Sequence, residues 1–238
     1  MDFLSINIET TGLDPAKDHV LQLVAVPFRT SDAGGRLWWG EQDISFEALV
    51  VPKEPVSASL QVLSMHSNLW KRMHGAEMEL ERVKSMEDSN HFIQREIIGG
   101  RTIVICHKDK LFLLFSRWLE KNYPKSINAA KFNVCGKNFG MFDYQFLLKC
   151  DERFKGLFKR RFLDPAQWFV RLEDDELPSM DECIIRVEPK FSEYMSPQPS
   201  VFDCLWVARA TGWLFVLGHY SQAYKAEKAK KAKRKKRK

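Results

Sequence analysis

The sequence lacks the cysteine pairs and the long apolar runs that mark several classes of protein. Its five cysteines are scattered and include no Cys-x-x-Cys pair, so we expect buried thiols in a reducing cytosol rather than a zinc site or a disulfide framework. No apolar run approaches the roughly 18 residues of a membrane span. The chain does not open with a basic segment followed by an apolar core. We therefore expect a cytoplasmic protein without membrane contact.

The composition is that of an ordinary globular protein. The chain has 238 residues, of which 45% are hydrophobic and 29% are charged, and this is enough to bury a full core. No internal repeat interrupts it. We expect one domain over residues 1–222, followed by a lysine- and arginine-rich tail over residues 223–238.

The positive charge of the chain is concentrated in that tail. The formal net charge is +6, but residues 225–238 hold ten Lys or Arg and one Glu, which leaves the rest of the chain at −3. The tail is either a solvated, solubilising charge run or a clamp on a polyanion. In the second case it points to a nucleoid or a nucleus as alternatives to the cytoplasm. The candidate nucleic-acid contacts are Lys228, Lys231, Arg234, Lys235 and Arg237.

The order of the expected elements is that of an α/β domain. The patterns predict strands at residues 3–8, 20–28, 44–51, 129–135 and 161–164. They predict helices that begin at Ser57 and at Pro165, and further helices over 70–96, 110–123, 141–150, 177–187 and 200–214. Because three strands come first in succession, the sheet should begin antiparallel.

Two polar side chains end the first of these strands. Residues 3–8 are followed by a Thr-Thr-Gly-Leu-Asp-Pro turn. Asn7 and Glu9 are two residues apart, so they point to the same face. Oxygen ligands side by side suit a hard divalent cation. Many edge strands carry polar residues at this spacing without binding anything, and spacing alone favours that alternative.

Two later segments each place an acid on a helix. Residues 134–147 contain a Gly-Lys-Asn-Phe-Gly loop before a helix with Asp143 in its first turn, where a carboxylate also suits the helix dipole. An ordinary acid at a helix start explains it equally well. Residues 198–209 place Asp203 in a largely apolar helix, and a carboxylate there needs a partner or a metal ion.

These three segments together resemble the motifs of the DEDD-type 3'–5' exonucleases, in their His-bearing branch, of the ribonuclease-H-like superfamily. The family's first motif is Asp-x-Glu-Thr-Thr-Gly-Leu, and this chain matches it except that Asn7 replaces the first acid. The third motif is His-x-Ala-x-x-Asp, and here Gln198 stands at the histidine position. The resemblance implies a ribonuclease-H-like exonuclease fold, with a central mixed sheet flanked by helices.

The resemblance also implies a chemistry and a set of residues. Four carboxylates of the family hold two Mg²⁺ or Mn²⁺ ions at the 3'-terminal phosphodiester of single-stranded DNA or RNA, and hydrolysis releases 5'-mononucleotides. The corresponding ligands in this chain are Asn7, Glu9, Asp143 and Asp203. Glu9 and the residue at position 198 would be catalytic. The residues implied in binding the terminal nucleotide are Thr10, Gly12, Leu13, Asn138 and Phe139.

The two departures from the pattern weaken the expected activity. Asn7 lacks the charge of the acid that it replaces, so both cations should bind less tightly. Gln198 does not titrate, and losing a general base typically costs about 10²–10⁴ in rate. Deliberate inactivation or drift towards binding without cleavage would each explain two amides, and the sequence does not distinguish them.

We therefore carry three hypotheses. The first is a 3'–5' exonuclease that is inactive or attenuated as written. The second is a pseudo-nuclease that binds single-stranded nucleic acid or nucleotides as a regulatory module. The third is an interaction subunit that docks on a polymerase or a nucleoprotein through its tail. The sequence leaves DNA and RNA open in each case.

Overall fold

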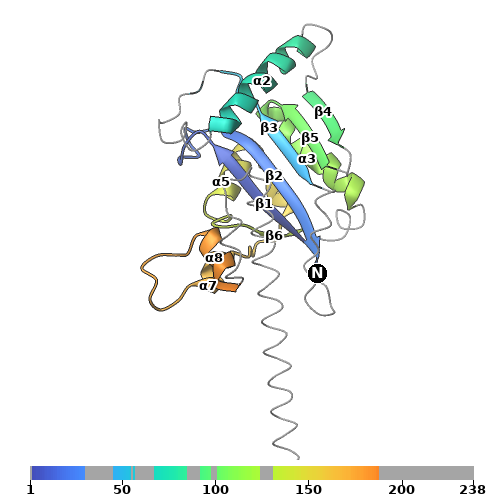
Figure 1. Ribbon diagram of the computed structural model, residues 1–238. Helices are drawn as coiled ribbons and strands as arrows, with labels where there is room; N and C mark the ends of the chain where they lie inside the picture. The colour runs from blue at the N-terminus through green and yellow to red at the C-terminus, as the bar shows by residue number, and fades with distance from the viewer. Residues whose placement is uncertain are drawn as a thin grey trace, which may run out of the picture.

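A computed structural model describes residues 2–29, 45–54, 56, 67–84, 92–97, 101–123 and 131–187 of the chain. This part folds around a six-stranded mixed sheet in the order β4-β5-β3-β2-β1-β6, with helices on both faces (Figure 1). The strands are β1 (Asp2–Thr10), β2 (Val20–Arg29), β3 (Phe46–Val50), β4 (Phe92–Ile97), β5 (Arg101–Cys106) and β6 (Asn133–Cys135). The helices are α2 (Ser67–Lys84), α3 (Lys108–Asn122), α5 (Asp143–Cys150), α6 (Phe154–Leu157), α7 (Pro165–Phe169) and α8 (Met180–Val187).

The first three strands form the antiparallel start that the sequence predicts. β1 pairs with β2, and β2 pairs with β3, both antiparallel. The sheet then becomes mixed, because β3 pairs with β5 and β1 pairs with β6 in parallel. β6 covers β1 only from Phe3 to Ser5. The rest of that edge of β1 therefore has no strand partner among the described residues.

Two apolar clusters hold the helices on opposite faces of the sheet. Alternate residues of β1, such as Leu4, Ile6 and Ile8, belong to the large cluster under α3 and α5. In that cluster Phe46 packs against Phe115, with ring centroids 5.2 Å apart. On the other face, α2 packs on β2, β3 and β5 through a smaller cluster. The α2 side chains in it are Leu69, Met73, Ala76 and Leu80.

A buried charge lies beside the α2 cluster. Glu47 of β3 has no exposed surface, and the Gln22 side chain donates a hydrogen bond of 2.6 Å to it. Arg72 of α2 and Arg101 of β5 both form ion pairs with it. Burial raises the pKa of Glu47, but the two guanidinium groups outweigh burial and hold that pKa below its ordinary value. This cluster ties α2 to the sheet.

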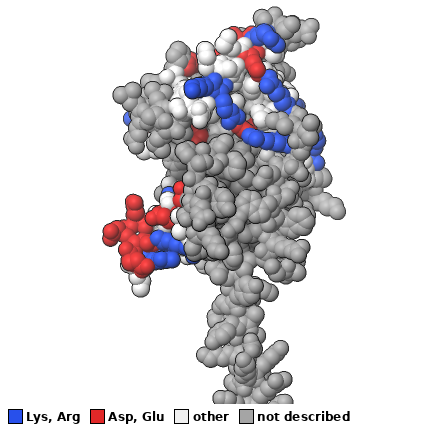
Figure 2. Space-filling view, viewed as in Figure 1, with Lys and Arg blue, Asp and Glu red and all other residues white. Residues whose placement is uncertain are grey.

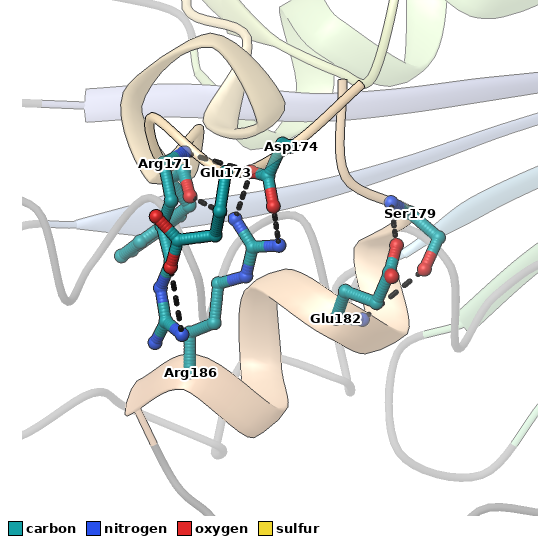
Figure 3. Close-up of polar contacts among 7 residues, drawn as sticks. Arg171, Glu173, Asp174, Ser179, Glu182 and Arg186 are labelled. Carbon is teal, nitrogen blue, oxygen red and sulfur yellow. Dashed lines mark hydrogen bonds and ion pairs between the residues drawn. The ribbon is translucent and has the colours of Figure 1, made fainter. Parts of the chain in front are cut away.

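The loop between α7 and α8 is held by polar contacts (Figure 3). Arg186 donates hydrogen bonds of 2.6 and 2.7 Å to Asp174. At the start of α8, the Ser179 amide donates to Glu182, and the Glu182 amide donates to the Ser179 hydroxyl, which is a reciprocal cap. Figure 2 shows acidic side chains gathered over this loop, which includes the acidic run at residues 173–176.

Several predicted elements are confirmed and two are wrong. The strands at 3–8 and 20–28 and the helix at 110–123 are present within a few residues, and α8 lies inside the predicted 177–187. The helix predicted over 70–96 is wrong over residues 92–96, which belong to β4, and the strand predicted over 161–164 is wrong, because only Leu163 forms an isolated bridge there.

β5 was not predicted at all, although its Thr-Ile-Val-Ile-Cys run has the composition of a strand. β4 is the outer strand beside it and has polar residues in its middle. The predicted helices that begin at Ser57 and at residue 200, and the tail, lie outside the described residues. No helix in the described part of the chain has both the length and the apolar character needed to cross a bilayer.

Candidate functional site

The uncovered edge of β1 is occupied by an acid from α5. The backbone amide of Ile8 donates a hydrogen bond of 3.0 Å to Oδ1 of Asp143. Asp143 is the first residue of α5, within the first helical turn as the sequence predicts, and only 4% of its surface is exposed. A side chain therefore takes the place of a strand partner at Ile8. This contact brings the second predicted acid to the end of β1 that carries the first motif.

Asn7 and Glu9 contact one another on the face of β1 opposite the large cluster. They share that face because the residue between them, Ile8, packs under α3 and α5. The Asn7 side-chain amide donates a hydrogen bond of 3.1 Å to Oε1 of Glu9. Burial raises the pKa of Glu9 to about 7, against the opposing effect of this hydrogen bond. Glu9 thus gains a proton far more readily than an ordinary glutamate.

Asp143 has an equally perturbed carboxyl group. Burial raises its pKa to about 7, and hydrogen bonds from backbone amides, that of Ile8 among them, lower it. The negative charges of Glu9 and Asp164 raise it further. The Glu9 and Asp143 carboxylates therefore repel one another where water screens their charges poorly. Such a pair is relieved by a shared proton or by a bound cation.

The donor atoms suit a hard divalent cation, although the described set is small. The carboxylates of Glu9 and Asp143 and the amide oxygen of Asn7 are the oxygen ligands that Mg²⁺ and Mn²⁺ prefer. Within the described ranges, no group of three or more His, Cys, Asp or Glu side chains could hold a metal ion. The other two predicted residues, Asp203 and Gln198, lie outside the described residues. The described residues fit one cation by chemistry, with two carboxylates instead of the family's four.

The turn after β1 is fixed by side chains that the sequence analysis did not single out. Thr11 donates a hydrogen bond of 3.1 Å to Asp18, and Asp18 accepts another of 2.9 Å from the Asp14 amide. A Cβ on Gly12 would come within 2.4 Å of the Asp18 carboxylate, so a larger residue here would displace that carboxylate from its hydrogen bonds in the turn. The repeated Thr and Asp residues of the turn were the available signal, but their pairing depends on how the turn folds back.

The nucleotide-binding residues predicted in this turn have different environments. The Thr10 hydroxyl donates a hydrogen bond of 2.6 Å to the Gly12 carbonyl, so it is used within the turn. Leu13 projects from the turn with 82% of its surface exposed. It is therefore the predicted binding residue with most surface available to a ligand here.

The loop before α5 is held between β1 and α7. Asn138 has the left-handed φ of 56°, and its backbone amide donates a hydrogen bond of 2.9 Å to Asp164, which also caps α7. Phe139 is fully buried, and its ring lies 4.9 Å from that of Phe162 between centroids. The Phe139 side chain therefore anchors the loop, while Asn138 is exposed beside it. Asp164 was a missed residue, and the Asp-Pro helix start was its signal.

The sheet order and the helix positions define the fold class as the ribonuclease-H-like exonuclease fold, with Glu9 and Asp143 brought together at the end of β1. This confirms the predicted fold, and it confirms the resemblance to 3'–5' exonucleases as a structural one. No family model and no curated protein matches the sequence.

Two solved structures of nucleases resemble the chain. The crystal structure of cell-death related nuclease 4 (CRN-4) has a TM-score of 0.55 and 13% sequence identity over 91% of this chain and 64% of that one. The nuclease domain of 3'hExo, a DEDDh family member bound to rAMP, also has a TM-score of 0.55, with 12% identity over 91% of this chain and 92% of that one. The chain thus spans less than two thirds of CRN-4. At these identities the likeness establishes the fold.

Proposed function

We propose that this chain binds the 3' ends of single-stranded DNA or RNA at Glu9 and Asp143, and that it hydrolyses them slowly with divalent cations to 5'-mononucleotides. The contact between Ile8 and Asp143 carries the proposal, because it brings two buried carboxylates together where the fold's first motif ends. The nuclease domain of 3'hExo, which has this fold, is bound to rAMP. A nucleoside monophosphate is the product that we propose here.

Some of the described residues would bind the cations, and others would contact the nucleic-acid strand. Glu9 and Asp143 would bind Mg²⁺ or Mn²⁺, together with the Asn7 amide oxygen and with Asp203. The bound ions would activate a water and stabilise the departing oxygen. Because both carboxyls have a pKa of about 7, they become available to a cation near neutral pH. Leu13 supplies an exposed apolar surface for the terminal base, and Asn138 lies exposed on the loop beside α5.

Two substitutions relative to the family pattern limit the rate. Asn7 supplies no charge, and its amide group already donates a hydrogen bond to Glu9. Gln198 can orient a water by hydrogen bonding but cannot accept its proton, so the general base is missing. Without a general base the rate of hydrolysis should fall by about 10²–10⁴, while the affinity for a 3' end does not depend on that base.

The contact between Asn7 and Glu9 favours a second candidate function, a pseudo-nuclease that binds ends without cutting. An aspartate at position 7 would repel Glu9 until a cation arrived, whereas the Asn7 amide stabilises the Glu9 carboxylate without one. In this version the site holds a 3' end or a nucleotide, and the lysine-rich tail adds affinity for the phosphate backbone. A polymerase or nucleoprotein partner of the tail belongs to the same regulatory alternative.

The two functions are separated by restoring the family acid. An Asn7→Asp variant should release 5'-mononucleotides from 5'-labelled DNA and RNA oligonucleotides with Mn²⁺, one residue at a time from the 3' end. The chain as written should do so more slowly, because Asn7 gives the cations one carboxylate fewer. An Asn7→Asp, Glu9→Gln double variant is the matched control and should show no cleavage. If Asn7→Asp binds ends but never cleaves, the pseudo-nuclease function stands and the exonuclease function fails.

A further inference from the structure

A cavity of about 290 Å³ lies close to the candidate site but is built from other residues. Its walls come from the turn between β1 and β2, the loop after β3, the start of α3 and the end of α5. Val20, Val50 and Phe146 form part of its lining and belong to the large apolar cluster, so the cavity opens on the α3 and α5 side of the sheet. Asn7, Glu9 and Asp143 do not line it.

Lysines dominate the polar part of the lining. Four of them come from the four different walls, and the lining itself holds two carboxylates, those of Asp18 and Glu54. Two more acids lie at the rim, because Asp14 pairs with Lys17 at 3.4 Å and Asp109 pairs with Lys53. The Asp18 carboxylate is already engaged by Thr11 and by the Asp14 amide. The lysines are Lys17, Lys53, Lys108 and Lys149. Lys17 and Lys53 therefore have acidic partners, and the positive charge available to a ligand is that of Lys108 and Lys149.

Two of the lysines, Lys149 and Lys108, have no ion pair among the described residues that would compete with a bound anion. Lys149 donates a hydrogen bond from its ammonium group to the Ala16 carbonyl, which draws the end of α5 to the β1–β2 turn across the lining. Lys108 forms no ion pair with any residue that the structure describes. Lys53 pairs with Asp109 at 3.3 Å, but both side chains are about half exposed or more, and such pairs contribute little.

The start of α3 adds backbone donors to this positive wall. α3 is a 15-residue helix, and its N-cap residue, His107, makes no side-chain hydrogen bond to the first-turn amides. The His107 ring instead has Nδ1 2.8 Å from the carbonyl oxygen of Val51. The first amides of α3 are thus left without a side-chain cap beside Lys108. Such amides and the helix dipole favour an anion.

We propose that this cavity is a phosphate-binding site, separate from the site at Glu9 and Asp143. Its volume lies near the lower end of the range for small-ligand pockets, about 300–1,000 Å³, which suits a phosphate group with part of a nucleotide rather than a large molecule. The phosphate comes either from a nucleic-acid strand that passes over the β1–β2 turn or from a free mononucleotide. A strand presents a phosphodiester monoanion and a mononucleotide presents a phosphate monoester with up to two charges, and the oxygens of either can accept hydrogen bonds from Lys108 and Lys149.

The proposal does not require hydrolysis at Glu9, so its test uses binding alone. The probes are inorganic phosphate, a 5'-mononucleotide and a single-stranded oligonucleotide, each added to the full chain. Isothermal titration gives the affinities, and amide NMR shifts locate the site. We expect phosphate to shift the backbone amides of His19, Lys108, Asp109 and Lys149, whereas amides of α2 and α8 should stay in place.

Variants then test the lysines with the net charge matched. The Lys108→Gln, Lys149→Gln variant should bind phosphate about tenfold more weakly or worse, because two charge-assisted hydrogen bonds are lost. The Lys155→Gln, Lys159→Gln variant has the same net charge, and both of its sites are exposed outside the cavity, so it should bind as the parent does. The Lys108→Arg, Lys149→Arg variant keeps the charges and should retain binding, which shows that a loss is not caused by misfolding.

The same variants identify the source of the phosphate. A loss of oligonucleotide affinity in the cavity variant beyond that in the control variant assigns the site to a strand. A loss confined to phosphate and mononucleotide assigns it to a free nucleotide. Equal affinities of the cavity and control variants for all three probes would overturn the proposal, as would phosphate-induced shifts that avoid the cavity.

Discussion

Oδ1 of Asp143 lies 3.0 Å from the backbone nitrogen of Ile8, a residue 135 positions earlier in the chain. The contact does two things at once. It satisfies a strand amide that no strand of the described part of the chain reaches, and it holds an acid beside Glu9 in a buried place. The same carboxylate is thus part of the fold and part of the candidate site, and the two roles place different demands on its charge.

Replacing Asp143 separates these two roles. Asp143→Ala leaves the Ile8 amide buried without an acceptor and should lower the free energy of unfolding by about 1–3 kcal/mol. Asp143→Asn keeps an acceptor oxygen and removes the repulsion with Glu9, so it should be neutral or stabilising at pH 8. Urea unfolding of both variants measures this. Equal losses in Asn and Ala would show that the charge, and not the hydrogen bond, matters at Ile8.

The pH dependence of stability follows from the same pair. Folding raises the pKa of Asp143 and of Glu9 from 3.8 and 4.5 to about 7, so the native state holds more protons than the unfolded state between those values. The contribution of these groups to stability should fall as the pH rises from about 4 to about 7. In Asp143→Asn this decline should be visibly smaller. A decline of the same size in the variant would contradict the assignment.

Physical reasons explain which site residues could be predicted from the sequence and which could not. Asn7, Glu9 and Asp143 were predicted because each lies next to a local signal, a strand end or a helix start. The hydrogen bond from Thr11 to Asp18 and that from Asn138 to Asp164 were not predicted, because each joins separate segments and depends on how loops fold back. β4 was mistaken for helix because its outward polar residues resemble a charged helix.

Divalent cations should stabilise the chain through Glu9 and Asp143. Thermal unfolding with Mn²⁺ should shift to higher temperature, and the shift should grow as the pH rises through about 7, because protons compete with the ion for both carboxylates. Asn7→Asp should enlarge the shift and lower the stability of the metal-free protein, since the new carboxylate would repel Glu9. Calorimetry should show tighter binding in the variant. Identical affinity and stoichiometry in both proteins would remove Asn7 from the site.

The buried charge at Glu47 makes a prediction about stability alone. Arg101→Leu removes one of its two guanidinium partners, and the cost should be less than the roughly 3–5 kcal/mol of leaving a buried charge unpaired, because Arg72 and Gln22 remain. Adding Glu47→Gln to that variant should restore part of the loss. Because the pKa of Glu47 is held below its ordinary value, its stabilising effect should be present above pH of about 4.5 and lost as the pH falls through the lowered pKa. Chemical unfolding of the single and double variants tests the coupling, and additive effects would contradict it.

The tail should act on strand affinity without affecting the fold. Removing residues 224–238 should weaken oligonucleotide binding evenly across sequences and flatten its dependence on salt, which we expect to be about −0.7 per phosphate contacted on a log–log plot. Thermal stability should change little. A full-length variant with Gln at the tail's Lys and Arg positions is the matched control, and it should behave like the truncated chain. An unchanged salt slope would make the tail a solubilising segment.

The most direct measurement compares linear and circular single strands of one sequence, because only the linear strand has a 3' end. With Ca²⁺ to limit cleavage, fluorescence anisotropy should show that the chain binds the linear strand more tightly. The preference should disappear in Glu9→Gln, Asp143→Asn, and it should survive in the matched variant Glu152→Gln, Glu176→Gln, which makes the same charge change at exposed positions. Equal binding of the linear and circular strands by the parent chain would contradict the account, because Glu9 and Asp143 would then not recognise an end.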